Sequence, residues 1–546
     1  ICHHRQWLHG DNVSLMNRPQ DRFRHAIPGT LVATDPLSQG NRFMKTHLSM
    51  TMVGVLIPLL GITHICQASD RPNIVLLYAD DLGYGDLSAQ NEESKIRTPN
   101  LDQLASEGIR FTDGHSSSGI CTPSRYAMLT GRYHWRDFHG IVGPLGGTVF
   151  QPDQLTLPEM LQDRGYDTAC IGKWHLGWDW DSLRTSDTKS IQPQDFDWSR
   201  SIPQGPLDQG FDHYFGDTVI NFPPYAWIED DRLVQPPDTL MDTSVWKPIK
   251  EGGWECRPGP MVTGWDPYQV LPTLADKGVS YLHSRKTEER PFFLYFAFPC
   301  PHAPIIPNDE FDGRSQAGPY GDFVVQTDDV IGRLMKALAD AGLSENTLVI
   351  FTADNGPERY AYARDTKFNH WSSKPFRGLK RDIYEGGHHV PFMIRWPEII
   401  LPKQTSHALI SQVDLMATIA SIVNYPLPED AAHDSYDQLP VLKGEVSQVR
   451  QTHVHNTRER GYALRSHEWL LIDAKSGYVS KVDRAWVERY DYPSDDDSPV
   501  ELYDLANDPG QRDNLALKHP EIVEELSQKL KQLQSQGYSA PRLQPP

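Results

Sequence analysis

The chain has 546 residues, of which 38% are hydrophobic and 10% aromatic, enough apolar material for a large packed core and more than one domain. Its formal net charge is -20. Nucleic acids are bound by clustered Lys and Arg, and the sequence has no dense basic run, so no nucleic-acid partner is expected. An anionic substrate would have to be met by a local cationic pocket.

The N-terminal part is predicted to lie outside the folded body. Residues 1–43 show no sustained periodicity and are expected to be a non-native or disordered extension. From Met44 a short basic segment, an apolar run and small residues near Ala68 form the pattern of a signal peptide over residues 44–68. The apolar run of about a dozen residues falls short of the ~20 that span a bilayer, so stable membrane insertion is not expected. Export to the periplasm or the extracellular space is therefore predicted.

Four cysteines follow this segment: Cys121, Cys170, Cys256 and Cys300. They are too few for a disulfide framework in a chain of this length. A bridge between Cys256 and Cys300 in an oxidising compartment is left open.

Four apolar runs, rich in β-branched and aromatic residues, predict strands that are buried on both faces. Helical patterns separate them, one opening with a capping box at Thr156 and Glu159 and another over residues 328–341 that stops at Gly342. Strands alternating with helices predict an α/β fold with a large, mostly parallel sheet sandwiched by helices. The runs are residues 73–78, 168–171, 292–298 and 347–351.

Near residue 405 the pattern of alternating apolar strands and helices ends. Extended segments at residues 467–472 and 502–505 and an amphipathic helix over residues 520–534 predict a smaller α+β lobe with a small antiparallel sheet. We therefore expect a catalytic domain over residues 70–404 and a C-terminal subdomain over residues 405–546.

Each of the four predicted strands is followed at once by residues capable of chemistry. Because the carboxyl ends of parallel strands meet at one edge of a sheet, where ligands bind, these residues are expected to share a site. They are Asp80 and Asp81, then Lys173 and His175, then His302, and finally Asp354 and Asn355.

The strand-end acids and the asparagine supply only oxygen donors: Asp80, Asp81, Asp354 and Asn355. Such a set suits a hard divalent cation, Ca²⁺ or Mg²⁺, better than zinc. One Asp at a strand end is as readily a helix cap or a turn residue. The recurrence of oxygen donors at two strand ends favours the metal interpretation.

The string Cys121-Thr122-Pro123-Ser124-Arg125 opens another helical pattern. Pro123 suits a first turn, so Cys121 is expected at a helix N-terminus, which attracts anions, with Arg125 one turn further on. Here the sequence resembles the type I sulfatase family of the alkaline phosphatase superfamily. The hallmark of that family is C-x-P-S-R, whose cysteine a maturation enzyme converts to formylglycine. The resemblance runs over residues 72–533 and includes 172–177, 377–387 and 501–505.

The resemblance implies an alkaline phosphatase-like fold and a sulfatase that releases sulfate from a sulfated small molecule or glycan, most of all a sulfated carbohydrate. It implies one divalent cation, usually Ca²⁺, with Mg²⁺ as the alternative. The implied metal ligands are Asp80, Asp81, Asp354, Asn355 and the modified Cys121, and the implied catalytic residues are Cys121, Arg125, Lys173, His175, His302 and Lys380. The chain departs from the family at His389, where many relatives have arginine, and matches it only loosely at Asn221, so both stay outside the predicted site.

Two alternatives remain beside a sulfatase. The first is a phosphonate monoester or phosphodiester hydrolase of the same superfamily, although simple phosphatases there use Ser or Thr where this chain has Cys121. The second is a non-catalytic glycan-binding protein, which would have a broken site, whereas every core position is filled here. A sulfated substrate and a formylglycine-generating enzyme are the expected partners.

Overall fold

The structure is a computed structural model that describes residues 71–493 and 497–541. The described residues all belong to the second of two units into which the chain divides, Cys66–Pro546. The predicted extension and signal peptide, residues 1–43 and 44–68, lie outside the described residues.

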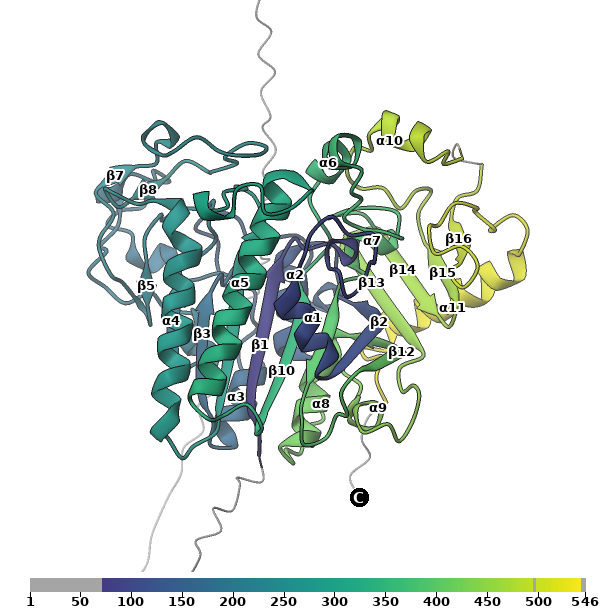
Figure 1. Ribbon diagram of the computed structural model, residues 1–546, viewed down its shortest axis with the longest axis horizontal. Coiled ribbons are helices and arrows are strands. Elements are labelled where there is room, and N and C mark those ends of the chain that lie inside the picture. Colours follow the sequence, from purple (N-terminus) through teal and green to yellow (C-terminus); the bar gives the residue numbers. More distant parts are fainter. Residues whose placement is uncertain (1–70, 494–496, 542–546) are drawn as a thin grey trace, which may run out of the picture. The chain divides into compact units, whose positions relative to one another are not determined.

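A ten-stranded sheet forms the centre of the second unit (Figure 1). The four predicted strands are adjacent and parallel in it, in the order β10, β1, β9, β3, which confirms the expected α/β fold. Strand β4 extends this parallel block beside β3. In spatial order the strands are β12 (Gln404–Ser411), β2 (Ile109–His115), β11 (Phe392–Arg395), β10 (Thr347–Ala353), β1 (Asn73–Asp80), β9 (Phe292–Pro301), β3 (Asp167–Gly172), β4 (His213–Gly216), β5 (Ile228–Glu229) and β6 (Arg232–Leu233).

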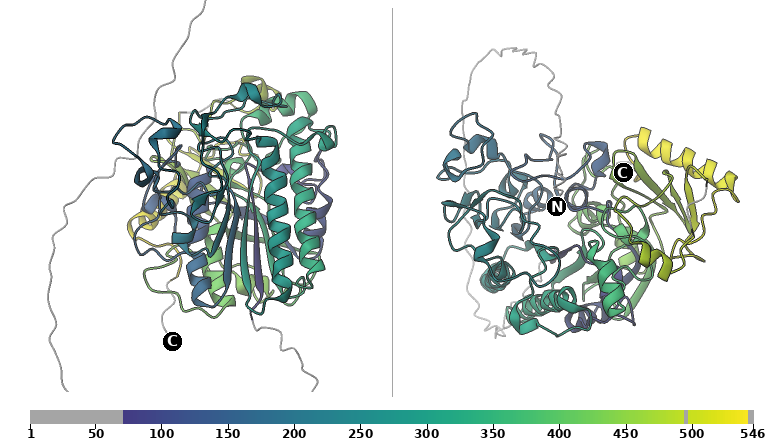
Figure 2. Two further views of the ribbon diagram at one scale, coloured as in Figure 1. Left: turned by 90° about the vertical axis from the view of Figure 1, so that its left-hand side faces the viewer. Right: turned by 90° about the horizontal axis from the view of Figure 1, so that it is seen from above.

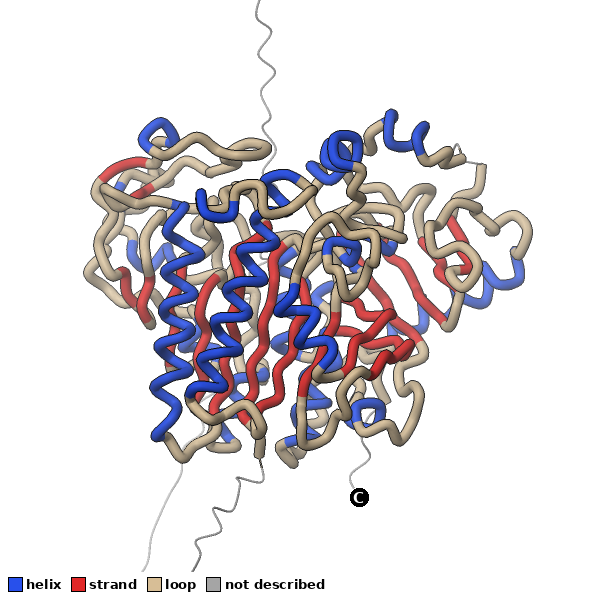
Figure 3. Tube along the Cα trace, viewed as in Figure 1, coloured by secondary structure: helices blue, strands red, loops and turns tan. Residues whose placement is uncertain are grey.

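Helices cover both faces of this sheet, because alternate side chains of its strands enter two separate cores. Helices α1 (Pro99–Ser106), α4 (Val270–Ser284) and α5 (Gly318–Asp340) pack against the face that carries Val75 and Leu77. Helices α2 (Cys121–Thr130), α3 (Leu157–Asp163) and α8 (Leu415–Ile422) pack against the face that carries Leu76 and Tyr78. The layering is visible in Figure 2, and Figure 3 shows α1, α4 and α5 in front of the strands.

Two helices can be compared with the start and stop signals predicted from the sequence. Helix α3 has the predicted capping box, in which Thr156 Oγ1 accepts from the Glu159 amide and the Glu159 carboxylate accepts from the Thr156 amide. Helix α5 ends before Gly342 as predicted but begins at Gly318, not at Asp328. Asp328 lies within α5, and its carboxylate accepts hydrogen bonds from the backbone amides of Asn100 and Leu101 in α1.

A second, antiparallel sheet and the last long helix form the predicted smaller lobe. The strands are β13 (Thr452–Arg458), β14 (Gly461–Ser466), β15 (Trp469–Ile472) and β16 (Glu501–Asp504). Helix α11 (Pro520–Ser535) packs Leu526, Leu530 and Leu533 into the core beneath this sheet. The predicted boundary after residue 404 falls inside β12, one residue after its start and within the last strand of the large sheet in the sequence, and stays a prediction. The remaining α-helices and β-strands of the described residues are α6 (Tyr360–Phe368), α7 (Glu385–His388), α9 (Leu439–Leu442), α10 (Arg484–Arg489), β7 (Thr239–Leu240) and β8 (Pro260–Met261).

All four cysteines of the described part are free thiols, so Cys256 and Cys300 are not paired in this structure.

Across residues 71–493 and 497–541, no helix has the length and apolar character needed to cross a membrane.

Candidate active site

The predicted polar residues meet at the carboxyl edge of the parallel strands. Asp80 ends β1, Asp354 and Asn355 follow β10, Lys173 follows β3, and His302 follows β9. All five side chains are buried, and His302 is the most exposed of them at 9%. The strand-end pattern therefore brings residues from four strands into one buried cluster.

Helix α2 points its first turn at this cluster. Cys121 is the first residue of the helix, as predicted, and its Sγ lies 3.5 Å from Asp80 Oδ1. Arg125, one turn on and fully buried, donates from Nε and Nη2 to Asp354 Oδ2 at 3.1 and 2.8 Å. Its Nη1 donates to the Tyr295 hydroxyl at 3.1 Å. Arg125 thus fixes the start of α2 against the end of β10.

Two lysines pair with the acids of β1. Lys173 Nζ lies 2.6 Å from Asp80 Oδ2, and Lys380 Nζ lies 2.8 Å from Asp81 Oδ2. His302 Nε2 lies 3.7 Å from the same Asp81 oxygen. With the pair between Arg125 and Asp354, three buried cations face three buried carboxylates. This pairing offsets the desolvation that would otherwise make each buried charge costly.

The oxygen donors of the cluster fit a divalent cation. Asn355 Nδ2 donates to Asp81 Oδ1 at 2.7 Å, while Asn355 Oδ1 is buried and has no hydrogen-bond partner among the described residues. An unpartnered buried carbonyl oxygen is unfavourable unless a ligand reaches it. Four residues of the cluster each have one potential ligand atom within 4.8 Å of the other three, namely Asp80, Asp81, Cys121 and His302. Carboxylate and amide oxygens are the donors that Ca²⁺ and Mg²⁺ prefer.

The electrostatics of the cluster suppress the thiolate form of Cys121. Burial raises the pKa of the Cys121 thiol well above its ordinary value, and the Asp354 carboxylate raises it further. Burial also raises the pKa of Asp354, to which the charge of Asp80 adds. Burial alone would raise the pKa of Asp80, but Lys173 and His302 bring it below its ordinary value. Because thiolates and not thiols are the reactive nucleophiles, an unmodified Cys121 is poorly placed for attack.

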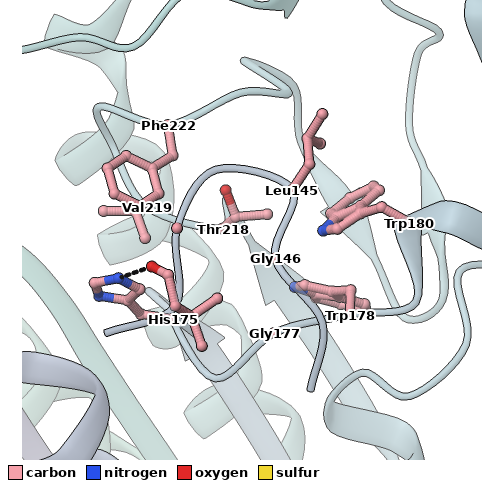
Figure 4. A pocket seen from close by; sticks show the side chains of 11 residues that line it. Leu145, Gly146, His175, Gly177, Trp178, Trp180, Thr218, Val219 and Phe222 are labelled. Atoms are coloured by element: carbon pink, nitrogen blue, oxygen red, sulfur yellow. Dashed lines mark hydrogen bonds between the residues drawn. The ribbon is translucent and has the colours of Figure 1, made fainter. Parts of the chain in front are cut away.

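Among the predicted site residues, His175 is the one whose side chain forms no hydrogen bond or ion pair with the cluster. Its Nε2 lies 3.0 Å from the Val142 carbonyl oxygen, in a pocket that is also lined by Trp178, Trp180 and Phe222 (Figure 4). Burial lowers the pKa of His175 well below its ordinary value, and Lys173 lowers it further. His175 therefore lines an aromatic pocket beside the charged cluster, close enough to Lys173 to feel its charge.

Sequence reasoning missed Asp217 and Glu358. Asp217 directly follows β4, is 2% exposed, and has no hydrogen-bond partner on either carboxylate oxygen among the described residues. Burial raises its pKa to about 7. Glu358 accepts from Arg381 at 2.8 Å and lies 3.8 Å from Lys380 Nζ. The strand-end rule would find Asp217 once the short strand β4 is recognised, but no local signal marks Glu358.

Comparison with known families matches nearly the whole described chain to sulfatases. Residues 72–425 match the family model described as Sulfatase, and residues 378–536 match the one described as N-sulphoglucosamine sulphohydrolase, C-terminal. The chain is 32% identical over 506 residues to an N-acetylgalactosamine-6-O-sulfatase of Bacteroides thetaiotaomicron, covering 86% of this chain and 94% of that protein. It is 34% identical over 492 residues to human arylsulfatase A, covering 85% of this chain and 87% of that protein.

Solved structures agree with an alkaline phosphatase-like fold. A structure from work on glycosaminoglycan metabolism by Bacteroides thetaiotaomicron superposes with a TM-score of 0.72 at 30% identity, covering 86% of this chain and 100% of that chain. A phosphonate monoester hydrolase of Agrobacterium radiobacter superposes with a TM-score of 0.55 at 18% identity, covering 86% and 96%. The second likeness shows the fold alone and lends no support to the phosphonate alternative.

Proposed function

The chain belongs to the sulfatase family and is a sulfuric ester hydrolase, and we propose that it releases sulfate from a sulfated carbohydrate through formylglycine made from Cys121. The observation that carries the proposal is the position of Cys121 at the first turn of α2, facing three buried carboxylates and two buried lysines. A formylglycine-generating enzyme is the partner that this modification requires.

The buried, protonated thiol supports the modification. Sulfate transferred to sulfur would have no simple route of release, and burial keeps the Cys121 thiol neutral. Converted to formylglycine and hydrated, position 121 would supply a hydroxyl for in-line attack on the sulfate sulfur.

We propose Ca²⁺ as the resident cation, held by Asp80, Asp81, Asp354, Asn355 and the modified Cys121. The free Asn355 oxygen and the all-oxygen donor set of the strand ends support this choice over a softer metal. A divalent cation bound there would lower the pKa of the attacking hydroxyl and neutralise charge on the sulfuryl group.

The cationic side chains are proposed to hold the sulfuryl oxygens. Lys173 is buried against Asp80, and Lys380 is buried against Asp81. These ion pairs hold both positive charges in place before the substrate binds. Preorganised charges of this kind stabilise the transition state without reorganisation. Arg125 is anchored on Asp354 and Tyr295, which suits holding the hydrate in position better than transferring protons.

The two histidines are proposed to move protons. His302 Nδ1 contacts the Ala303 carbonyl oxygen at 2.5 Å, which leaves Nε2 directed at the cluster, 3.7 Å from Asp81. Only the doubly protonated ring carries a proton on Nε2, so His302 would have to take up a proton before it could protonate the leaving alcohol. Burial and the charge of Lys380 lower the pKa of His302 and work against that state. His175, neutral because of its lowered pKa, would accept a proton from the second hydroxyl as sulfate departs.

A sulfated sugar is the proposed substrate class, and export to the periplasm or the extracellular space is the proposed location. The related Bacteroides protein is named for a sulfated amino sugar.

The proposed function is tested by sulfate release from a panel of sulfated monosaccharides and oligosaccharides, with the matching phosphate esters measured in parallel. The enzyme should be produced together with a formylglycine-generating enzyme and assayed with Ca²⁺. Release of sulfate from at least one sugar, far faster than phosphate from its analogue, is the expected result. A preference for phosphate or phosphonate esters would move the assignment to the alternative hydrolase.

A further inference from the structure

We propose that the chain contains a second metal site, formed by His115, His388 and His453 and suited to a transition metal such as zinc. These three residues, the histidine triad, come from β2, α7 and β13. Each contributes one ring nitrogen to a set whose members all lie within 4.8 Å of one another, and each side chain is fully buried. The triad shares no residue with the proposed sulfate site.

The spacing of two triad nitrogens suits a shared ion. His115 Nδ1 and His388 Nδ1 lie 3.1 Å apart. Two imidazole nitrogens bound to a tetrahedral zinc, each at about 2.0–2.1 Å, stand about 3.3–3.4 Å apart. The pair therefore needs only a small movement to become two ligands of one ion.

The other ring nitrogens already face oxygen acceptors. His115 Nε2 lies 2.7 Å from Asp113 Oδ1, and His453 Nε2 lies 3.2 Å from the Ser116 carbonyl oxygen. His388 Nε2 lies 3.9 Å from Glu385 Oε1. Metal-bound histidines characteristically donate their second N–H to a carboxylate or a backbone carbonyl, which fixes the ring. His115 and His453 have such an acceptor within hydrogen-bond distance, and His388 Nε2 would have to move closer to Glu385 Oε1 to gain one.

The metal-free hydrogen-bond pattern leaves two groups unsatisfied. When both rings are neutral and the His115 Nε2–H is directed to Asp113, the His115 Nδ1 carries a lone pair. His388 then donates from Nδ1 and keeps a lone pair on Nε2. That lone pair faces Glu385 Oε1, and neither atom has a hydrogen-bond partner among the described residues. Unsatisfied buried acceptors of this kind are unfavourable.

A bound cation would remove this conflict. With the ion on Nδ1, His388 would carry its proton on Nε2 and could donate it to Glu385. The ion's charge would be offset by Asp113 and Glu385, of which only Asp113 is already paired with an arginine, Arg465, at 3.3 Å. On binding, the His453 Nδ1 would exchange its 3.1 Å contact with the Tyr133 hydroxyl for the metal.

The donor chemistry separates this site from the proposed calcium site. Imidazole nitrogens suit zinc, copper, iron and nickel, whereas the strand-end oxygens suit Ca²⁺ and Mg²⁺. The triad joins the large sheet through β2 to the small sheet through β13. An ion at this junction would act structurally by tying the two sheets together, near the loop that carries Lys380.

The experiment measures zinc bound by the full chain in a Cys121→Ala background with excess Ca²⁺, so that the sulfate site does not collect zinc. Metal is stripped with a chelator, zinc is returned, and bound zinc is measured by mass spectrometry of the elements and by X-ray absorption. His388→Gln and His453→Gln are compared with His407→Gln, a matched change of an exposed histidine.

One zinc per chain with a nitrogen and oxygen shell at about 2.0–2.1 Å is expected. The His388→Gln and His453→Gln variants should bind it at least tenfold more weakly, and His407→Gln should bind it as the background does. Absence of stoichiometric zinc in the background would overturn the proposal, and so would triad variants that bind zinc as tightly as the background does. Should the triad variants not fold, the absorption spectrum of the background protein decides alone, because a shell without imidazole also refutes it. The experiment does not measure sulfate release, so its result tests the zinc site independently of the proposed function.

Discussion

Replacement of Lys173 by methionine is expected to remove most turnover. The ammonium is fully buried and 2.6 Å from Asp80, and methionine keeps much of the length of the side chain without the charge. Loss of one preorganised stabilising group costs about 10²–10³-fold in kcat, or about 2.7–4 kcal/mol. We therefore expect Lys173→Met to lower kcat by that amount, because methionine has no charge to neutralise the sulfuryl oxygens in the role proposed for Lys173.

The same change should couple stability to calcium. Without Lys173, the nearest cation to Asp80 is Arg125, whose Nη2 is 3.7 Å from Asp80 Oδ1. Removal of one partner from a buried ion pair costs about 3–5 kcal/mol. A cation bound by Asp80 would restore the missing charge, so Ca²⁺ should raise the Tm of Lys173→Met more than that of the wild type.

Steady-state sulfate release and thermal unfolding with and without chelator measure both effects. Lys336→Met is the matched control, because the Lys336 side chain is 72% exposed. Turnover of Lys173→Met equal to that of the control, at saturating Ca²⁺, would refute the catalytic role. An equal Ca²⁺ effect on the Tm of both variants would refute the place of Asp80 among the metal ligands.

Three further predictions concern proton transfer, metal binding and pH. His302→Gln should slow hydrolysis of alkyl sulfates by about 10²–10⁴-fold and affect aryl sulfates with acidic phenols far less, and an equal loss on both would exclude general-acid catalysis. Asp354→Asn should weaken Ca²⁺ binding in calorimetry, and an unchanged affinity would remove Asp354 from the ligand set. Asp217, whose pKa is raised to about 7 by burial, is neutral below that pH and charged above it, so kcat/KM for an anionic substrate should fall as pH rises through about 7. Asp217→Asn should flatten that fall, and an unaltered profile would exclude Asp217 as its cause.

The strand-end residues of the site could be predicted from the sequence because local patterns and one topological rule suffice. Asp80 and Asp354 follow long apolar strands, and parallel pairing of β1 with β10 places their ends side by side. Arg125 follows from its position one turn after Cys121. These predictions need no knowledge of distant contacts.

Other features depend on contacts that no local pattern encodes. Lys380 lies in a loop without periodicity, so only the family resemblance pointed to it. Strand β4 has only four residues, which hid the strand end before Asp217. The histidine triad joins residues from β2, α7 and β13, segments that meet only in the folded chain. Sequence spacing carries no information on such a meeting.

The chemical state of residue 121 tests the central claim most directly. Peptide mass spectrometry across Cys121 in fully active enzyme, paired with sulfate release by Cys121→Ala, provides the measurement. We expect the aldehyde or its hydrate in the active protein and no turnover in Cys121→Ala. An intact thiol in fully active enzyme, or retained activity in the alanine variant, would contradict the mechanism.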